Sequence, residues 1–330
     1  MAVSSRTLDL IQIAKSWNYQ EVSDEEMLKW LNEVCPQICH IEMSISAPIN
    51  IIRARCEYDY TKASIKYPCN ISFPPEPEEY EKHKIKRGRC NVEGKAVFYG
   101  VIKDKESNEN DVFKVAVKET SKIYHNNTCG FEKEDAVLST WAVKKTFRAL
   151  IFVHHEAFAS PHSLLAELRE KFEIEIENDP QRDDLIEFAK FFSSEFAKNV
   201  GSNSDHEYRL SSLFSNLHFT KGLDAILYPS VRGSGDFINI AIRKELADSR
   251  SDENALELIQ AKILWIQKLG STLDFVNYMF AKNLGHTTEF VFQKADNFEV
   301  ELGELFSNYF IENINSVLCV MPNQSTVIES

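Results

Sequence analysis

The stretch RGRCNVEGKAVFYG, residues 87–100, places two arginines on a glycine turn that leads straight into an apolar run. Glycine allows the tight backbone turns that other residues disfavour. Residues 93–102 then alternate loosely between apolar and polar positions, which predicts a strand. Tyr99 stands near the end of this strand. The segment therefore predicts a cationic turn that feeds a strand with a tyrosine near its end.

The chain around this turn is acidic, with 37 Lys and Arg against 50 Asp and Glu and a net charge of −13. Its 330 residues, 43% hydrophobic and 26% charged, are typical of one large soluble domain or two smaller ones. Nucleic acid is a poor partner, since phosphate binding needs a basic field. No run approaches the roughly 20 apolar residues of a membrane span, and no signal pattern opens the chain. Seven scattered cysteines favour reduced thiols and a cytoplasmic protein.

The hydrophobic pattern mixes helices and strands without a regular alternation, which predicts an α+β fold. Helices are expected at 6–15, 24–34, 111–123, after Ser160-Pro161, after Asp179-Pro180, from Asp205 and near 301–314. Strands are expected at 137–155, AILYPSV, DFINIAI and in the run between about 256 and 295. Residues 68–86 hold four prolines and predict an extended connector.

Three regions follow from this pattern. Residues 1–48 predict a helical N-terminal extension, 49–245 a central domain, and 246–330 a β-rich C-terminal extension packed on the core. The central region holds the glycine turn.

Several short motifs of the chain do not predict a functional site. GSGD at 233–236 follows a strand but opens no helix, so it is not a dinucleotide fingerprint. Cys35, Cys39 and His40 lack a second ligand cluster, and no metal site is expected. His154-His155 ends a strand and is interpreted as structural.

Four elements remain: IIRAR (51–55), RGRCN to VFYG (87–100), VKET (117–120) and YPSV to NIAI (228–242). Taken in this order, they resemble the RES domain, a family named for its arginine, glutamate and serine. The residues that match the family pattern are Arg53 or Arg55, Gly88-Arg89-Cys90-Asn91, Gly94, Tyr99, Glu119, Tyr228-Pro229-Ser230 and Asn239. The resemblance covers about residues 50–245. Arg53 is preferred over Arg55 because it directly follows the apolar pair Ile51-Ile52.

The resemblance implies an ADP-ribosyltransferase-like fold and an enzyme that cleaves the nicotinamide–ribose bond of NAD+. Water or inorganic phosphate would be the acceptor, and many members are toxins held by a partner antitoxin or immunity protein. NAD+ is then a substrate, with no resident cofactor. The catalytic residues implied are Glu119, Arg53, Tyr99 and Ser230. The NAD+-binding residues implied are Arg89, Arg55, Arg87, Asn91 and Asn239. Whether the chain forms a homo-oligomer stays open.

The residue types suit this chemistry independently of the resemblance. Arginines on a glycine turn can bind a pyrophosphate bidentately. The barrier to nicotinamide loss lies in an oxocarbenium-like ribosyl cation, which a nearby carboxylate such as Glu119 stabilises. Three alternatives stay open: transfer of ADP-ribose to a macromolecule, a non-catalytic module that binds NAD+ or ADP-ribose, and a plain interaction protein.

Overall fold

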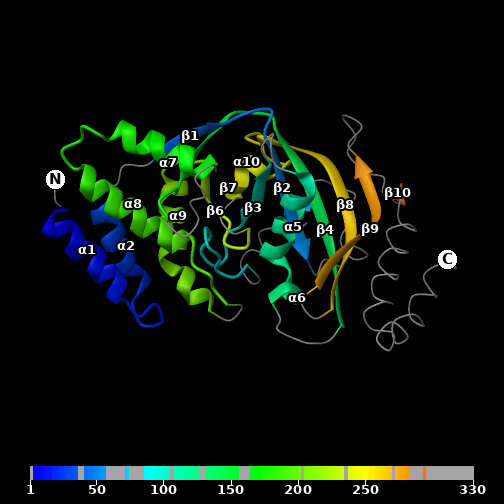
Figure 1. The fold of residues 1–330 in the computed structure, drawn as a ribbon, viewed down its shortest axis with the longest axis horizontal. Coiled ribbons are helices and arrows are strands. Elements are labelled where there is room, and N and C mark those ends of the chain that lie inside the picture. Colours follow the sequence, from blue (N-terminus) through cyan, green and yellow to red (C-terminus); the bar gives the residue numbers. More distant parts are fainter. Residues whose placement is uncertain are drawn as a thin grey trace.

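A single mixed sheet organises the fold (Figure 1). The computed structural model describes residues 3–35, 41–56, 71–73, 85–103, 108–125, 131–155, 164–201, 204–233, 237–269, 272–282 and 293–294. The strands in these ranges are β1 (Ile41–Ile45), β2 (Asn50–Cys56), β3 (Val97–Lys103), β4 (Phe131–Val143), β5 (Phe147–Ile151), β6 (Ala225–Pro229), β7 (Ile238–Arg243), β8 (Leu256–Leu269), β9 (Thr272–Lys282) and β10 (Gln293–Lys294). Their order is β1-β5-β6-β7-β3-β2-β4-β8-β9-β10, and β5–β6 is the parallel pair among antiparallel neighbours.

Helices interleave with these strands along the chain, so the predicted α+β class is confirmed. They are α1 (Ser5–Ser16), α2 (Asp24–Val34), α5 (Glu109–Thr120), α6 (Lys122–His125), α7 (Leu164–Glu175), α8 (Arg182–Phe196), the 3-10 helix η3 (Asp205–Tyr208), α9 (Arg209–Thr220) and α10 (Lys244–Ala247). None of the helices described is both long and apolar enough to cross a membrane.

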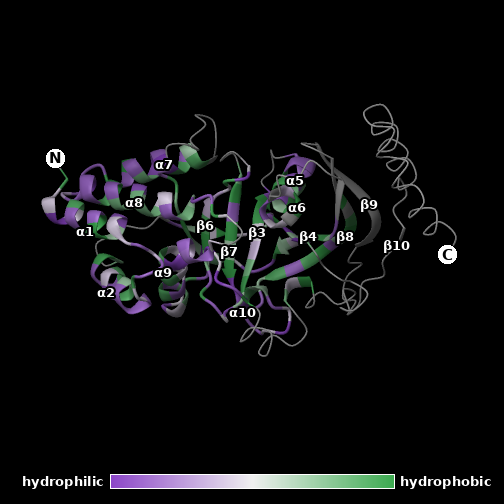
Figure 2. Cartoon of the chain, turned by 90° about the horizontal axis from the view of Figure 1, so that it is seen from below, coloured by the Kyte–Doolittle hydropathy of each residue, from purple (hydrophilic) through white to green (hydrophobic). Residues whose placement is uncertain are grey.

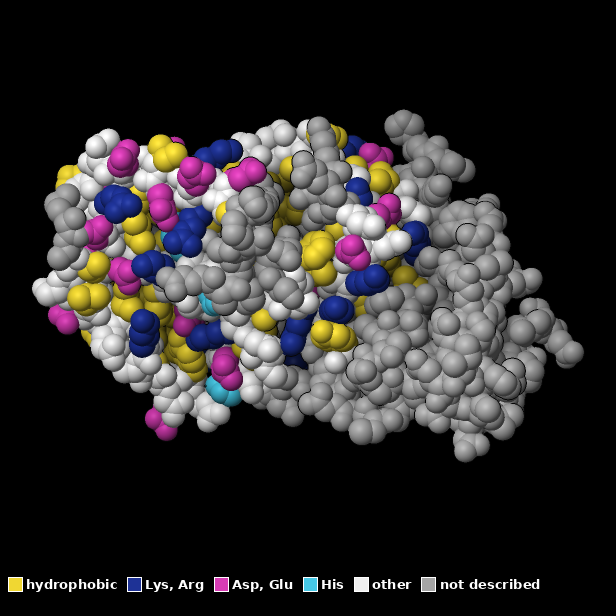
Figure 3. Space-filling view, in the orientation of Figure 1, with side chains coloured by type: hydrophobic (Ala, Val, Ile, Leu, Met, Phe, Trp, Pro, Cys, Tyr) yellow, Lys and Arg dark blue, Asp and Glu magenta, His cyan; other side chains and the backbone are white. Residues whose placement is uncertain are grey.

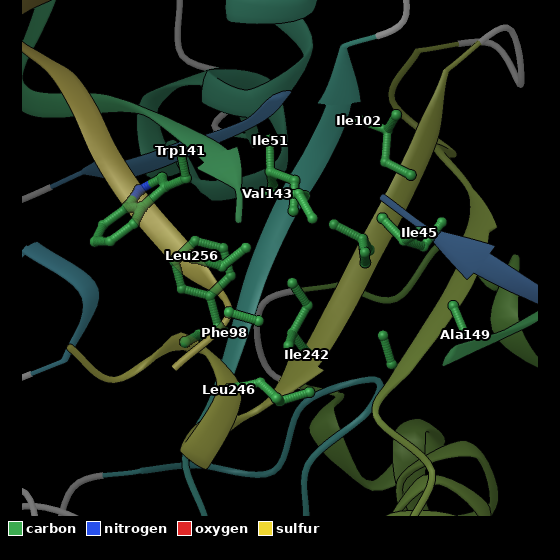
Figure 4. Packing of buried hydrophobic residues seen from close by; sticks show 14 of the residues in the cluster. Ile45, Ile51, Phe98, Ile102, Trp141, Val143, Ala149, Ile242, Leu246 and Leu256 are labelled. Carbon is green, nitrogen blue, oxygen red and sulfur yellow. The ribbon is translucent and has the colours of Figure 1, made fainter. Parts of the chain in front are cut away.

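One face of the sheet carries a continuous apolar core. Phe98, Trp141 and Ile242 lie in it, and the Phe98 and Trp141 rings meet edge to face at 5.4 Å (Figure 4). Leu165 and Leu168 of α7 pack against this cluster. Strand residues of alternate positions supply it, as expected when successive side chains point to opposite faces.

Two separate helix groups cover the opposite face. The first group is α1, α2, α8 and α9 (Figure 1). These helices bury a phenylalanine-rich cluster over β5, β6 and β7. The second is α5 with α6, which pack over β2, β3 and β4. The helices of the first group turn hydrophilic residues outward, and green hydrophobic segments run along the central strands (Figure 2). The boundary between the two helix groups lies at the centre of this face, where β7 of the first set of strands pairs with β3 of the second.

The N-terminal helices belong to the first group. Ser23 and Glu26 form a capping box at the start of α2, and Trp30 packs edge to face on Phe191 of α8. Residues 41–45, inside the segment expected to be helical, form β1, which pairs with β5 at the sheet edge. Basic and acidic side chains are interspersed over this helical end of the molecule (Figure 3).

The C-terminal strands continue the same sheet. β8 pairs along β4 from Leu256 to Leu269, and β9 pairs with β8. The expected helix near 301–314 lies outside the described residues, as do Ser160-Pro161, Cys39, His40, residues 68–70 and 74–84 of the expected connector and residues 234–236 of the GSGD turn.

Candidate active site

A two-lobed cavity opens between the two helix groups. The aromatic lobe, about 410 Å³, is lined by Ile52, Arg53, Ala54, Arg55, Cys56, Gly88, Arg89, Tyr99, Gly100, Val101, Ala116, Glu119, Thr120, Tyr208, Tyr228 and Asn239. The cationic lobe, about 560 Å³, is lined by Lys86, Arg87, Arg89, Glu119, Lys198, Asn199, Val200, Gly201, Asp205, Tyr208, Val231 and Arg232. Arg89, Glu119 and Tyr208 line both lobes and so mark their junction. Each volume is in the range of small-molecule sites.

A carboxylate is fixed at this junction. Ser230 Oγ donates to Glu119 Oε1 at 2.6 Å, and Asn239 Nδ2 donates to the same oxygen at 2.9 Å. Ser230 accepts in turn from the backbone N–H of Gly233 at 2.9 Å. No described residue bonds Oε2. One carboxylate oxygen is therefore held by two donors, while the other remains available to a ligand.

Local folding explains how these three residues meet. Asn108 caps the N-terminus of α5, whose Val112, Val115 and Ala116 are buried against the sheet, and Glu119 follows in the last turn. Asn239 of β7 stands opposite Tyr228 of β6 in the strand register. The pairing of β6 with β7 thus places Ser230 and Asn239 side by side, beneath Glu119 at the end of α5.

Ser230 is fully buried and lines neither lobe. The structure therefore gives it a positioning role toward Glu119, while the catalytic role implied by the resemblance stays a prediction. Asn239 does line the aromatic lobe, and its buried Oδ1 has no hydrogen-bond partner among the described residues. An unsatisfied buried acceptor of this kind calls for an explanation, and a ligand donor supplies one.

Arg53 lies where β2 and β3 separate, since their pairing ends at Ile52 opposite Val101. Its Nη1 donates to the Tyr99 carbonyl at 2.9 Å, and its guanidinium lies 4.8 Å from the centre of the Phe98 ring. Burial first, and the charge of Arg55 second, lower the pKa of Arg53 to about 9. The side chain stays a cation at neutral pH, and its buried Nε lacks a partner among the described residues.

The glycine turn is held by a polar network. The Tyr99 hydroxyl accepts from the Cys90 N–H at 2.8 Å and donates to Asn91 Oδ1 at 2.8 Å. Asn91 also donates to the Lys86 carbonyl. A Cβ on Gly88 would lie 2.5 Å from Asn91 Oδ1, so only glycine fits beside this hydrogen bond. Gly94 takes a left-handed φ of 75°.

This network involves two residues that the sequence analysis placed at the site. Asn91 lines neither lobe, and its amide holds the turn instead of contacting a ligand. The Tyr99 hydroxyl serves the same turn, and burial raises its pKa well above the ordinary value. Only the ring of Tyr99 is left for a ligand in the aromatic lobe.

The two arginines of the turn differ in role. Arg89 donates to the carbonyls of Phe196 and Lys198, at 2.5 and 2.8 Å, and so caps the end of α8. Its guanidinium also lies 5.0 Å from the centre of the Tyr208 ring. Arg87 is held at 2.9 Å by Asp24 of α2, and it also donates to Ser212. Arg87 therefore links the turn to the N-terminal helices, although it borders the cationic lobe.

Tyr99→Phe tests the turn. We expect the free energy of unfolding to fall by about 1–3 kcal/mol, because a buried donor and acceptor lose their shared partner. Tyr228→Phe is the matched control, since the Tyr228 hydroxyl has no hydrogen bond to a described residue. Urea denaturation of both variants measures the difference, and equal stabilities would refute the turn-holding role of Tyr99.

Sequence reasoning missed four residues of the site. Tyr208 stands at the junction, and Lys86, Lys198 and Arg232 line the cationic lobe. Lys198 follows the end of α8 and Tyr208 ends the 3-10 helix η3. Neither belongs to a motif, so no local signal marked them. Arg232 lies two residues after Ser230 of the Tyr-Pro-Ser block, and Lys86 directly precedes Arg87 of the glycine turn. Proximity to these motifs was the available signal.

No protein-family model matches the chain, and a search of curated proteins gives no match.

Proposed function

We propose that the chain is a RES-like enzyme, with an ADP-ribosyltransferase-like core, that cleaves the nicotinamide–ribose bond of NAD+. The observation that carries the proposal is the Glu119 carboxylate, fixed by Ser230 and Asn239 at the junction of an aromatic and a cationic lobe. A carboxylate held in place before reaction needs no reorganisation when positive charge develops beside it.

The reaction balances without a redox partner. The bond between the ribose C1 and the pyridinium nitrogen breaks, and its electron pair leaves with neutral nicotinamide. The ribosyl carbon becomes oxocarbenium-like, and the free Oε2 of Glu119 stabilises it through charge and through the ribose hydroxyls. Water then adds to C1 and loses its proton, or phosphate adds directly.

The lobes divide the substrate between them. The aromatic lobe offers the rings of Tyr99 and Tyr228 for the flat nicotinamide, with Arg53 as a fixed donor. The Oδ1 of Asn239, which has no hydrogen-bond partner in the described part of the chain, can accept from the carboxamide or a ribose hydroxyl. The cationic lobe suits the diphosphate, and Arg89 stands between the two parts. Arg55 also lines the aromatic lobe.

Product identification tests the reaction and names the acceptor. Purified protein is incubated with NAD+, with and without phosphate, and with a mixture of cell proteins. Free ADP-ribose indicates hydrolysis, ADP-ribose-1″-phosphate indicates phosphorolysis, and labelled macromolecules indicate ADP-ribosyl transfer. NAD+ binding without nicotinamide release would instead support a non-catalytic binding module and contradict the proposal.

Toxicity is part of this proposal, because an NAD+-cleaving enzyme depletes its host. An antitoxin or immunity protein would have to cover the two lobes. No residue of the range 3–35 or 41–48 lines either lobe, so this restraint is expected from a partner chain and not from the N-terminal helices.

A further inference from the structure

The cationic lobe concentrates positive charge in an acidic protein. Five basic residues line it, namely Lys86, Arg87, Arg89, Lys198 and Arg232, against the two acids Glu119 and Asp205. The whole chain carries a net charge of −13, so this excess is local. A concave surface lined by one sign of charge attracts ligands of the opposite sign.

Three of the five cations already have partners in the protein. Arg87 pairs with Asp24, and Arg89 donates to carbonyls at the end of α8. Lys198 Nζ lies 2.6 Å from Glu195 Oε2 and 4.3 Å from the centre of the Tyr19 ring. These contacts hold the wall of the lobe together and use much of each side chain's capacity to bind an anion.

Lys86 and Arg232 differ from the other three. Neither has an ion pair or a side-chain hydrogen bond with a described residue. Lys86 precedes the glycine turn and Arg232 lies in the loop after β6, so they reach the same lobe from two separate segments. The charged groups of Lys86 and Arg232 can therefore both donate to a phosphate, and Arg89 lies beside them at the junction of the lobes.

We propose that Lys86 and Arg232 form the diphosphate subsite, and that the site selects ligands with a phosphate-bearing half beyond the reacting ribose. The identity of that ligand as a dinucleotide rests on the proposed function. The anion subsite itself rests only on the charges of the lobe. In this proposal Lys86 and Arg232 take the phosphate-binding role that the sequence suggested for Arg87.

Calorimetric titration with ADP-ribose tests the subsite on the full-length protein. The test variant is Lys86→Ala/Arg232→Ala, and the control is Lys29→Ala/Lys171→Ala, which removes the same charge from exposed positions outside both lobes. We expect at least about tenfold weaker binding in the test variant and an unchanged affinity in the control. The wild-type affinity should also fall with salt more steeply than that of the test variant.

Asp205→Asn should change the affinity for ADP-ribose in the opposite direction. It removes an acid from the lining of the lobe, so ADP-ribose should bind severalfold more tightly. Equal affinities of the wild type and the Lys86→Ala/Arg232→Ala variant would overturn the subsite, as would a wild type that does not bind ADP-ribose. Nicotinamide release from NAD+ is measured in parallel. If the test variant loses ADP-ribose binding and the wild type releases no nicotinamide, the subsite stands and only the proposed reaction fails.

Discussion

Glu119→Gln should lower the rate of NAD+ cleavage by a factor on the order of 10²–10³, the loss typical of removing one preorganised electrostatic group. The amide keeps the shape of the side chain but has no negative charge to oppose the ribosyl cation. Ser230 and Asn239 both donate to Oε1, and the amide oxygen can still accept from them. The fold should therefore persist, and NAD+ binding should change much less than turnover.

Glu109→Gln is the matched control, because it removes the same charge from the exposed first turn of the same helix. Initial rates of nicotinamide release from both variants give the comparison, and circular dichroism checks the fold. A Glu119→Gln protein that turns over NAD+ at the wild-type rate would remove the carboxylate from the mechanism.

Deletion of residues 1–48 should abolish the folded state. The deletion removes eight buried side chains of the phenylalanine-rich cluster: Leu10, Ile11, Ala14, Met27, Trp30, Leu31, Val34 and Cys35. Burial of one large apolar side chain contributes about 1.5–3 kcal/mol, and a domain has only about 5–15 kcal/mol in total. The deletion also removes β1 from the sheet edge and leaves Arg87 without Asp24.

The yield of soluble protein and its thermal unfolding measure this effect. Deletion of residues 1–3 is the control, because it leaves the N-cap Ser4 and all of α1. A soluble 49–330 fragment that cleaves NAD+ faster than the full chain would show instead that the N-terminal segment inhibits the site.

Local pattern in the sequence was enough to predict several elements of the fold. The serine and acids before residue 27 mark the start of α2, and apolar spacing marks α9. The helix expected at 111–123 is interrupted at Ser121, whose hydroxyl donates to the buried Glu134 at 2.6 Å. That partner lies 13 residues later, on β4, so the break could not be predicted locally. The edge pairing of β1 with β5 likewise depends on distant residues.

For the site as well, some residues could be predicted from motifs, whereas the roles of others depend on residues distant in the sequence. The sequence predicted Glu119, Ser230 and Asn239 as site residues through the family resemblance, and the fold brings them into hydrogen-bond contact. The roles of Arg87 and Asn91 could not be predicted, because Asp24 and the Lys86 carbonyl become their partners only after folding. A motif identifies a residue, but its three-dimensional neighbours decide whether it contacts a ligand or the protein.

Nicotinamide release from NAD+ is the decisive measurement for Glu119-dependent cleavage. Purified full-length protein is used well below the NAD+ concentration, and the release is monitored by chromatography. We expect many equivalents of nicotinamide per protein molecule, with the rate lost in Glu119→Gln and retained in Glu109→Gln. An intact NAD+ pool after prolonged incubation with the folded wild-type protein, with and without phosphate and acceptor proteins, would contradict it.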